Sequence, residues 1–179
     1  MLYAFGFERV GVVVSDLYFV DPRPRPGQEG AERGVRLELR LLARGELKGS
    51  IYSARPIEVA DPIWRVDLLE TASGPRGSLD RAHHHPTFTG WEPGRRVFDE
   101  ELKADPVAWV GAQLADLPAL LARADVPMDD KLAADADSLR ERAPEIMSAV
   151  RGLLDGVKAG TLAVAPAGDQ PDSARISWL

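Results

Sequence analysis

Hydrophobic positions recur at every second residue through the first half of the chain, which is typical of β-strands. Four apolar residues between Val35 and Leu41 alternate with charged ones, and residues 10–20 form a longer β-branched and aromatic stretch. The first pattern predicts a half-exposed strand and the second a largely buried strand. Residues 21–34 hold three Pro, three Gly and no apolar run. We expect a long, mobile loop there.

Turn signals divide the rest of this half into further strands. The predicted strand segments cover residues 47–54, 57–59, 63–69 and 79–85. Turns at Arg44-Gly45 and at Ala60-Asp61-Pro62 predict two hairpins, and Pro86 ends the last strand or confines it to a sheet edge. Since the connections are short, the strands are expected to form an antiparallel meander.

From residue 105 onward the hydrophobic period is that of helices. The predicted helices begin at Asp105-Pro106, Asp129-Asp130 and Pro144, and end near Leu121, Leu139 and Gly160. Asp and Pro are favoured at helix starts, and Gly follows helix ends. We expect Pro118 to kink or split the first helix.

Strands followed by helices predict an α+β fold with one domain over residues 1–179. An antiparallel meander of about five strands in residues 1–98 is expected to be covered on one face by the helices of residues 99–179. Trp64 is expected between the two layers. Residues 1–98 carry 14 basic and 13 acidic side chains, a net charge of +1, and residues 99–179 carry 8 basic and 15 acidic side chains, a net charge of −7. The negative charge of the chain therefore comes from the helical half.

Composition excludes several classes of protein. Without Cys, the chain has no disulfide, thiol nucleophile, zinc finger or iron–sulfur site. No apolar run approaches the roughly 18 residues of a membrane span, and no targeting segment is visible, so we expect a soluble cytoplasmic protein. The 18 Arg against 4 Lys, with no Asn, indicate a GC-rich bacterial genome. The negative net charge makes nucleic-acid binding unfavourable.

All three histidines form one run, His83-His84-His85. On a strand, His83 and His85 point to one face and His84 to the other. Two imidazoles at this spacing suit Zn, Ni, Mn or Fe. A third ligand would come from a nearby acidic residue, and the candidates are Asp67, Glu70, Asp80 and Glu92.

Two other roles for this run stay open. One histidine with Asp67 or Glu70 is enough for metal-free acid–base chemistry. Alternatively, polar residues near a strand end are often surface or hydrogen-bonding residues. The His-Glu-x-x-His and Gly-x-Ser-x-Gly motifs are absent.

The spacing from Gly77 over five residues to His83-x-His85 partly resembles the first motif of the cupin family. That resemblance implies an antiparallel β-barrel with a metal site. The family's Glu is missing, because Thr89 and Gly90 stand at its place, and no His remains for the second cupin motif. The match covers less than a tenth of the chain, so we do not assign the chain to this family.

Two hypotheses on function follow. The first is a small-ligand or divalent-metal-binding domain, which in one form of the hypothesis catalyses a hydrolysis. His83 and His85 would be the metal ligands, and Asp67 or Glu70 would supply the carboxylate. Arg81 would hold an anionic substrate, Tyr52 would line the pocket and Trp91 its mouth. The second is a non-catalytic interaction or regulatory partner that uses the acidic helices or the sheet edge at Pro86. A homo-oligomer through that edge is part of this hypothesis.

Overall fold

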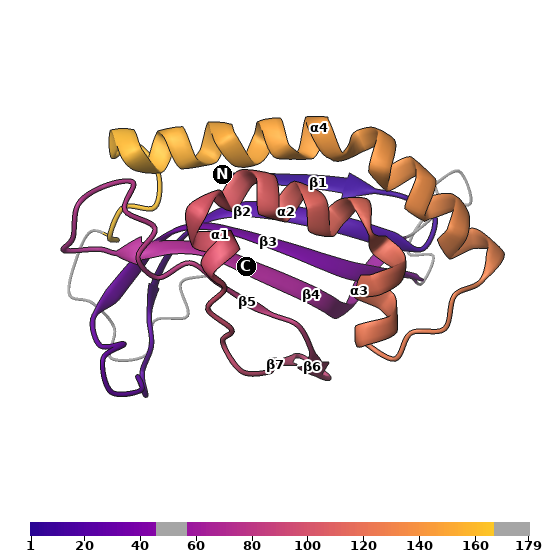
Figure 1. Ribbon diagram of the computed structural model, residues 1–179, viewed down its shortest axis with the longest axis horizontal. Coiled ribbons are helices and arrows are strands. Elements are labelled where there is room, and N and C mark those ends of the chain that lie inside the picture. The colour runs from indigo at the N-terminus through magenta and orange to yellow at the C-terminus, as the bar shows by residue number, and fades with distance from the viewer. Residues whose placement is uncertain (46–56, 167–179) are drawn as a thin grey trace.

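The N-terminal half of the chain forms a five-stranded antiparallel sheet in the order β1-β2-β3-β4-β5 (Figure 1). The structure is a computed structural model, and it describes residues 1–45 and 57–166. The strands of this sheet are β1 (Leu2–Gly6), β2 (Val10–Val20), β3 (Ala31–Arg44), β4 (Ile57–Thr71) and β5 (His83–His85). A small separate hairpin follows, made of β6 (Phe88–Thr89) and β7 (Glu92–Pro93). The meander predicted from the alternating pattern is therefore confirmed.

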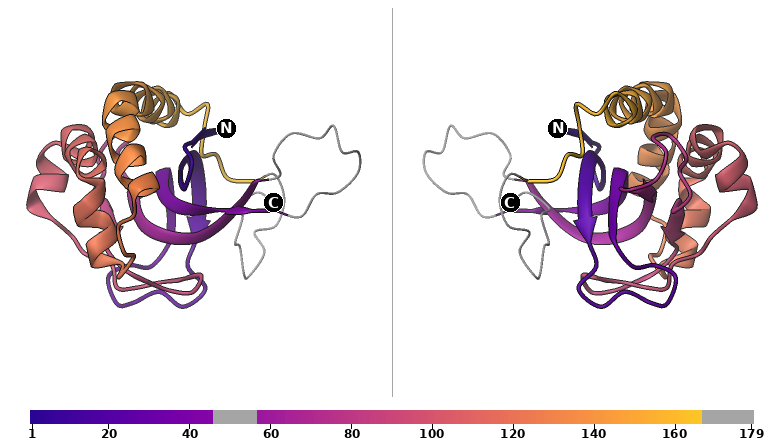
Figure 2. Two further views of the ribbon diagram at one scale, coloured as in Figure 1. Left: turned by 90° about the vertical axis from the view of Figure 1, so that its right-hand side faces the viewer. Right: turned by 90° about the vertical axis from the view of Figure 1, so that its left-hand side faces the viewer.

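The helices of the second half lie on one side of this sheet (Figure 2). They are α1 (Glu100–Ala104), α2 (Pro106–Ala115), α3 (Leu117–Arg123) and α4 (Asp130–Ala159). Helix α4 contacts β2 and β3, and α2 packs against α4. This arrangement confirms the predicted α+β class.

The core lies between the sheet and the helices. Alternate residues of β2, β3 and β4 point into it and meet the apolar stripe of α4. Fully buried members are Val12, Leu37, Leu39, Trp64, Val66, Leu139, Ile146 and Val150. Trp64 occupies the predicted position, and burying a side chain of this size contributes several kcal/mol. The opposite sheet face carries the alternating polar residues.

The strand boundaries differ from the prediction in three places. Residues 57–71 form one strand rather than a hairpin, and Pro62, which has no N–H to donate, lies at the register shift between β3 and β4. The N-terminal residues add β1, and the last strand is limited to His83–His85. The predicted strand at 47–54 lies outside the described residues.

The loop predicted over residues 21–34 is shorter, because β3 already begins at Ala31. Gly34 is a strand residue: a Cβ there would lie 2.1 Å from the Leu68 carbonyl oxygen, so the close approach of β3 and β4 requires glycine. The loop is also tied to the sheet, since the Arg81 guanidinium donates to the carbonyl of Gly27.

The helices begin close to the predicted residues, but one of the predicted helix breaks is not present. Asp116 caps α3 after α2 ends, so the predicted split near Pro118 is confirmed. Pro144, in contrast, lies inside α4, which is bent but continuous (Figure 1). Leu139 before this proline and Ile146 after it are both buried, and this packing outweighs the loss of one backbone hydrogen bond.

One buried carboxylate fixes α4 to the sheet. Asp135 accepts backbone N–H groups from Glu8, Arg9 and Val10 at 3.0, 2.7 and 3.0 Å, at the turn between β1 and β2. Three charge-assisted hydrogen bonds satisfy this carboxylate in the interior. Asp135 therefore sets where the long helix lies on the sheet.

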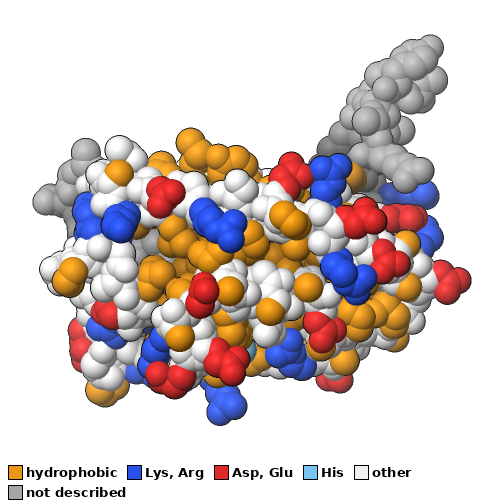
Figure 3. Space-filling model, turned by 45° about the horizontal axis from the view of Figure 1, so that its top comes forward, with side chains coloured by type: hydrophobic (Ala, Val, Ile, Leu, Met, Phe, Trp, Pro, Cys, Tyr) orange, Lys and Arg blue, Asp and Glu red, His pale blue; other side chains and the backbone are white. Residues whose placement is uncertain are grey.

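The helical side carries acidic and basic side chains interspersed with apolar ones (Figure 3). On α4, Arg140 pairs with Asp137 and Arg142 with Glu145, at 2.8 and 2.7 Å. The acidic residues of this half thus do not form a surface of one sign. Within residues 1–45 and 57–166, no helix combines the length and apolar character needed to cross a membrane.

Candidate metal centre

Two rows of polar side chains cross β3, β4 and β5 on the sheet face away from the helices. The strand register gives the rows Arg36-Asp67-His83 and Glu38-Arg65-His85. Their neighbours Val66 and His84 point to the core, so the period of two places all six on the other face. The predicted orientation of the histidine run is therefore confirmed.

Asp67, His83 and His85 form a compact, buried cluster. Each offers one ligand atom, and the three atoms lie within 4.8 Å of one another. The Asp67 Oδ2 atom is 3.5 Å from His83 Nε2 and 3.4 Å from His85 Nε2. Their side chains are 1, 1 and 4% exposed. The structure thus brings together three of the residues predicted for a metal site.

Backbone carbonyls fix which ring nitrogen carries the proton. His83 Nδ1 lies 2.6 Å from the Arg81 carbonyl oxygen, and His85 Nδ1 lies 2.8 Å from that of Gly94. Because a carbonyl oxygen only accepts, both Nδ1 atoms donate. In the neutral rings both Nε2 lone pairs then face Asp67, an arrangement common among metal-binding histidines.

The two Nε2 atoms differ in their partners. His85 Nε2 accepts a hydrogen bond of 2.9 Å from Arg65 Nη2. His83 Nε2 is buried and has no hydrogen-bond partner within the described part of the chain. A buried acceptor without a donor costs free energy, so such atoms are rare outside functional sites.

Two guanidinium groups keep the cluster's carboxylate charged. Arg36 donates to both Asp67 oxygens, from Nε at 2.6 Å and from Nη2 at 3.4 Å, and Arg65 Nε lies 3.0 Å from Oδ2. Burial alone would raise the pKa of the Asp67 carboxyl, but the charges of Arg36 and Arg65 hold it well below its usual value. Asp67 is therefore ionised at neutral pH.

Burial also lowers the pKa values of two neighbouring groups, His85 and Arg65. Burial lowers the pKa of His85, with the charge of Arg65 acting the same way and Asp67 opposing it. Burial also lowers the pKa of the Arg65 guanidinium, while its attraction to Asp67 raises it. Low His85 basicity keeps this imidazole neutral, which is the form that binds metals.

Aromatic side chains cover this polar face. The Phe98 ring lies 5.5 Å from the ring of His83. The β6–β7 hairpin places Phe88 over Arg65, 5.9 Å from ring centroid to guanidinium carbon, and Trp91 over Arg40 at 4.8 Å. Trp91 itself is 61% exposed, so the hairpin forms the outer wall of the site.

The structure separates Glu70 from the other candidates. It lies on the helix side of β4, where it pairs with Arg33 at 2.7 Å and accepts the backbone N–H groups of Gly77 and Ser78. These contacts order the turn that follows β4. The alternative with Glu70 as the carboxylate is wrong, because successive strand residues face opposite sides.

The remaining predicted residues have other positions. Asp80 binds Thr71 and Ser78, and Glu92 lies in β7. The Arg81 guanidinium donates to Thr71, whereas its carbonyl orients His83, so Arg81 acts through its backbone. Tyr52 lies outside the described residues.

Sequence reasoning missed Arg36 and Arg65 as members of the site. Both are charged residues at alternate positions of strands whose other face is apolar. Phe98, which follows the bridge between Val97 and His84, was also missed. The alternation gave a signal for the two arginines, but none for Phe98.

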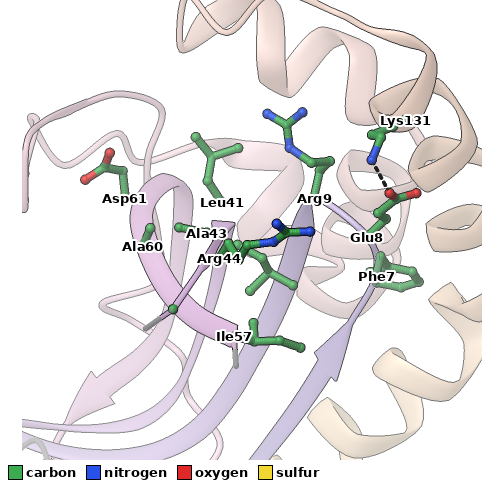
Figure 4. A pocket seen from close by; sticks show the side chains of 12 residues that line it. Phe7, Glu8, Arg9, Leu41, Ala43, Arg44, Ile57, Ala60, Asp61 and Lys131 are labelled. Carbon is green, nitrogen blue, oxygen red and sulfur yellow. Dashed lines mark hydrogen bonds and ion pairs between the residues drawn. The ribbon is translucent and has the colours of Figure 1, made fainter. Parts of the chain in front are cut away.

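The structure also holds a groove of about 790 Å³ at the end of the sheet (Figure 4). Leu41 and Ile57 form part of its wall, and Arg9 and the Lys131–Glu8 ion pair lie at its rim. A smaller cavity lies between Asp16 and the segment after α4. Neither cavity includes a member of the Asp67-His83-His85 cluster.

The fold and the site together define an α+β protein with a five-stranded antiparallel meander. A buried Asp-His-His cluster lies on the sheet face away from the helices. Comparisons with protein-family models, curated proteins and solved structures each find no match to this chain.

Proposed function

We propose that Asp67, His83 and His85 bind a divalent first-row transition metal ion, and that the protein is a small-ligand-binding or hydrolytic metalloprotein. The observation that carries the proposal is the orphaned His83 Nε2, buried and directed toward a carboxylate oxygen 3.5 Å away. A cation between these atoms would satisfy both.

The donor set supports this class of ion. Two imidazoles and one carboxylate suit Fe²⁺, Zn²⁺, Mn²⁺ and Ni²⁺, and three protein ligands leave positions for water or substrate. A metal ion in such a site would lower the pKa of a bound water, and the resulting hydroxide is the nucleophile of many metal-dependent hydrolases. The carbonyls of Arg81 and Gly94 would hold the imidazoles in place.

Metal binding to untagged protein tests the proposal. After treatment with EDTA, added Ni²⁺ or Zn²⁺ should raise the midpoint of thermal unfolding by several degrees, because a ligand that binds only the folded state stabilises it. His83→Gln and His85→Gln should each abolish that increase. The matched control is His84→Asn, whose side chain lies on the other sheet face and retains an acceptor for Trp64.

If Ni²⁺, Zn²⁺ and Mn²⁺ all leave the thermal unfolding midpoint of the wild-type protein unchanged, the proposal is ruled out. Equal responses of His83→Gln and wild type would do the same, because the metal would then bind elsewhere. Loss of the response in His84→Asn, with this variant folded, would likewise contradict the assignment of ligands to one face.

A second candidate function, interaction with another protein chain, is favoured by the free edge of the sheet. Strand β1 pairs only with β2 among the described strands, and its Leu2 and Tyr3 are exposed. The edge expected at Pro86 is less open, since the backbone of Val97 pairs with His84. We propose no nucleic-acid partner, because Arg36, Arg40 and Arg65 all pair with carboxylates.

Light scattering across a range of concentrations tests this second candidate, with Tyr3→Lys as the variant. A dimer that dissociates in Tyr3→Lys would support pairing through β1. A monomer at every concentration would exclude self-association through this edge.

A further inference from the structure

Arg36 and Arg65 hold the Asp67 carboxylate in different ways. Arg36 donates to both carboxylate oxygens. Arg65 Nε lies 3.0 Å from Oδ2 but forms no hydrogen bond within the described residues, so a buried donor is left unsatisfied. Arg36 is therefore the firmly bonded partner, and Arg65 is the one that is easier to displace.

The Arg65 guanidinium lies on atoms that a metal ion would use. Its Nη2 donates to His85 Nε2 at 2.9 Å, and its Nε is close to Asp67 Oδ2. Two of the three ligand atoms thus face this cation. A guanidinium and a metal ion cannot use the same lone pairs, so metal binding requires that Arg65 move.

The surroundings offer the guanidinium other contacts. Glu38 lies 3.9 Å from Arg65 Nη1, and the Phe88 ring lies 5.9 Å from the guanidinium carbon. A carboxylate and an aromatic face both attract a guanidinium. A rotation toward them would keep Arg65 beside the cluster while freeing the ligand atoms.

The charges of the cluster then call for an anion. Asp67 supplies one negative charge against the two guanidinium groups that contact it. A divalent cation adds two positive charges in a buried place, which is unfavourable without a counter-charge. A carboxylate or phosphate oxygen pair matches the parallel N–H groups of a freed guanidinium.

We propose that Arg65 exchanges between two roles: it caps Asp67 and His85 when no metal is bound, and it binds a small oxyanion beside the metal ion when one is. This inference rests on the proposed metal site. It names the substrate class of that site as compounds with a carboxylate or phosphate group.

Calorimetric titration of untagged, EDTA-treated protein with Ni²⁺ tests the exchange. The titrations use a buffer free of phosphate and carboxylates, and are repeated with inorganic phosphate and with acetate. The variants are Arg65→Gln and Arg65→Lys. The matched control is Arg96→Gln, because Arg96 is about as exposed as Arg65 and pairs with Glu32, at 2.9 Å, rather than with Asp67 or Glu38.

In the absence of anion, Arg65→Gln should bind Ni²⁺ about tenfold more tightly than wild type, since the competing cation is gone. Phosphate or acetate should tighten Ni²⁺ binding by wild type by about tenfold and leave Arg65→Gln unchanged. Arg65→Lys keeps the positive charge but lacks the parallel N–H groups of a guanidinium. Its Ni²⁺ affinity should therefore stay near that of wild type, while phosphate or acetate should tighten its Ni²⁺ binding less. Arg96→Gln should behave as wild type in both experiments.

The outcomes separate the inference from the proposal beneath it. If no protein binds Ni²⁺, the metal site itself is refuted, and the exchange with it. If wild type, Arg65→Gln and Arg65→Lys bind Ni²⁺ with one affinity and one anion response, the metal site stands and the exchange is refuted. A response to phosphate but not acetate narrows the substrate class to phosphates, and the reverse narrows it to carboxylates.

Discussion

The two faces of β5 place the same side chain in opposite environments. His84 points to the helices, where its ring lies 5.0 Å from that of Trp109, and its Nδ1 accepts from Trp64 Nε1 at 3.4 Å. His83 and His85 point to the charged face. All three are buried, so the difference is in their partners rather than in their exposure.

Burial acts differently on the two faces because a charged side chain contacts the imidazoles of His83 and His85, whereas aromatic rings contact that of His84. On the helix side, burial is the main cause that lowers the pKa of His84, to about 4. On the other side, the charge of Asp67 opposes the effect of burial on His85. An imidazole among apolar rings is a core residue, whereas two imidazoles beside an ionised carboxylate are a candidate ligand set.

Removing the charge of Asp67 should have the largest effect on this contrast. Asp67→Asn leaves the half-buried Arg36 and Arg65 without their buried carboxylate, and breaking a buried pair costs about 3–5 kcal/mol. Urea unfolding measures the loss. We also expect the variant to lose the stabilisation by Ni²⁺.

Glu38→Gln is the control for that experiment. Glu38 is on the same face but 14% exposed, and it pairs mainly with Arg40. Its replacement should cost about 1–2 kcal/mol, because the Glu38–Arg40 pair is half-buried and not fully buried. If Asp67→Asn is as stable as Glu38→Gln, the charged face does not depend on Asp67, and the proposed contrast between the faces fails.

A smaller effect is expected from pH in metal-free protein. The folded-state pKa of His84 is about 4, against about 6.5 in the unfolded chain. As the pH falls, the unfolded chain therefore binds this proton first. The contribution of His84 is fully present above about pH 6.5 and is lost progressively toward pH 4, by about 3 kcal/mol.

Urea unfolding at steps between pH 7 and pH 4 in the presence of EDTA measures this slope. The lowered pKa of His85 acts in the same direction, and the lowered pKa of Asp67 acts mainly below this window. His84→Asn should flatten the slope by more than half. An unchanged slope in His84→Asn would show that the helix-side imidazole is not the group that titrates.

Much of this contrast follows from the sequence alone. The period of two places His84 opposite to His83 and His85, and it places Trp64 on the core face. With Trp64 in the core, the same alternation puts Asp67 on the other face and Glu70 on the core face. That step would have removed Glu70 from the candidate ligands.

The rest depends on register, which no local pattern sets. Asp67 meets His83 because β4 and β5 pair in one particular register across residues 72–82. The sequence pattern of that turn does not fix the pairing, and a shift of one residue would exchange the faces. The Gly94 carbonyl that orients His85 depends on the fold of the segment after β5, which has little regular structure. The site is therefore a tertiary feature, whereas the faces are a local one.

The last prediction concerns the ring protons and leaves stability unchanged. His83 and His85 donate from Nδ1 to backbone carbonyls, whereas His84 Nδ1 accepts from an indole N–H. Neutral His83 and His85 should therefore carry the proton on Nδ1, and His84 on Nε2. Protonated and unprotonated ring nitrogens differ strongly in ¹⁵N chemical shift, so a long-range ¹H–¹⁵N spectrum of metal-free protein distinguishes the two forms.

The chain has three histidines, so the untagged protein should give three imidazole patterns, two of one tautomer and one of the other. His84→Asn should remove the single Nε2–H pattern and leave the pair, which assigns the spectrum. Two remaining rings protonated on Nε2 would contradict the structure, because their lone pairs would then point away from Asp67. Two rings with free Nε2 atoms would mean that both faces of β5 are set in metal-free protein, one for packing and one for the proposed coordination.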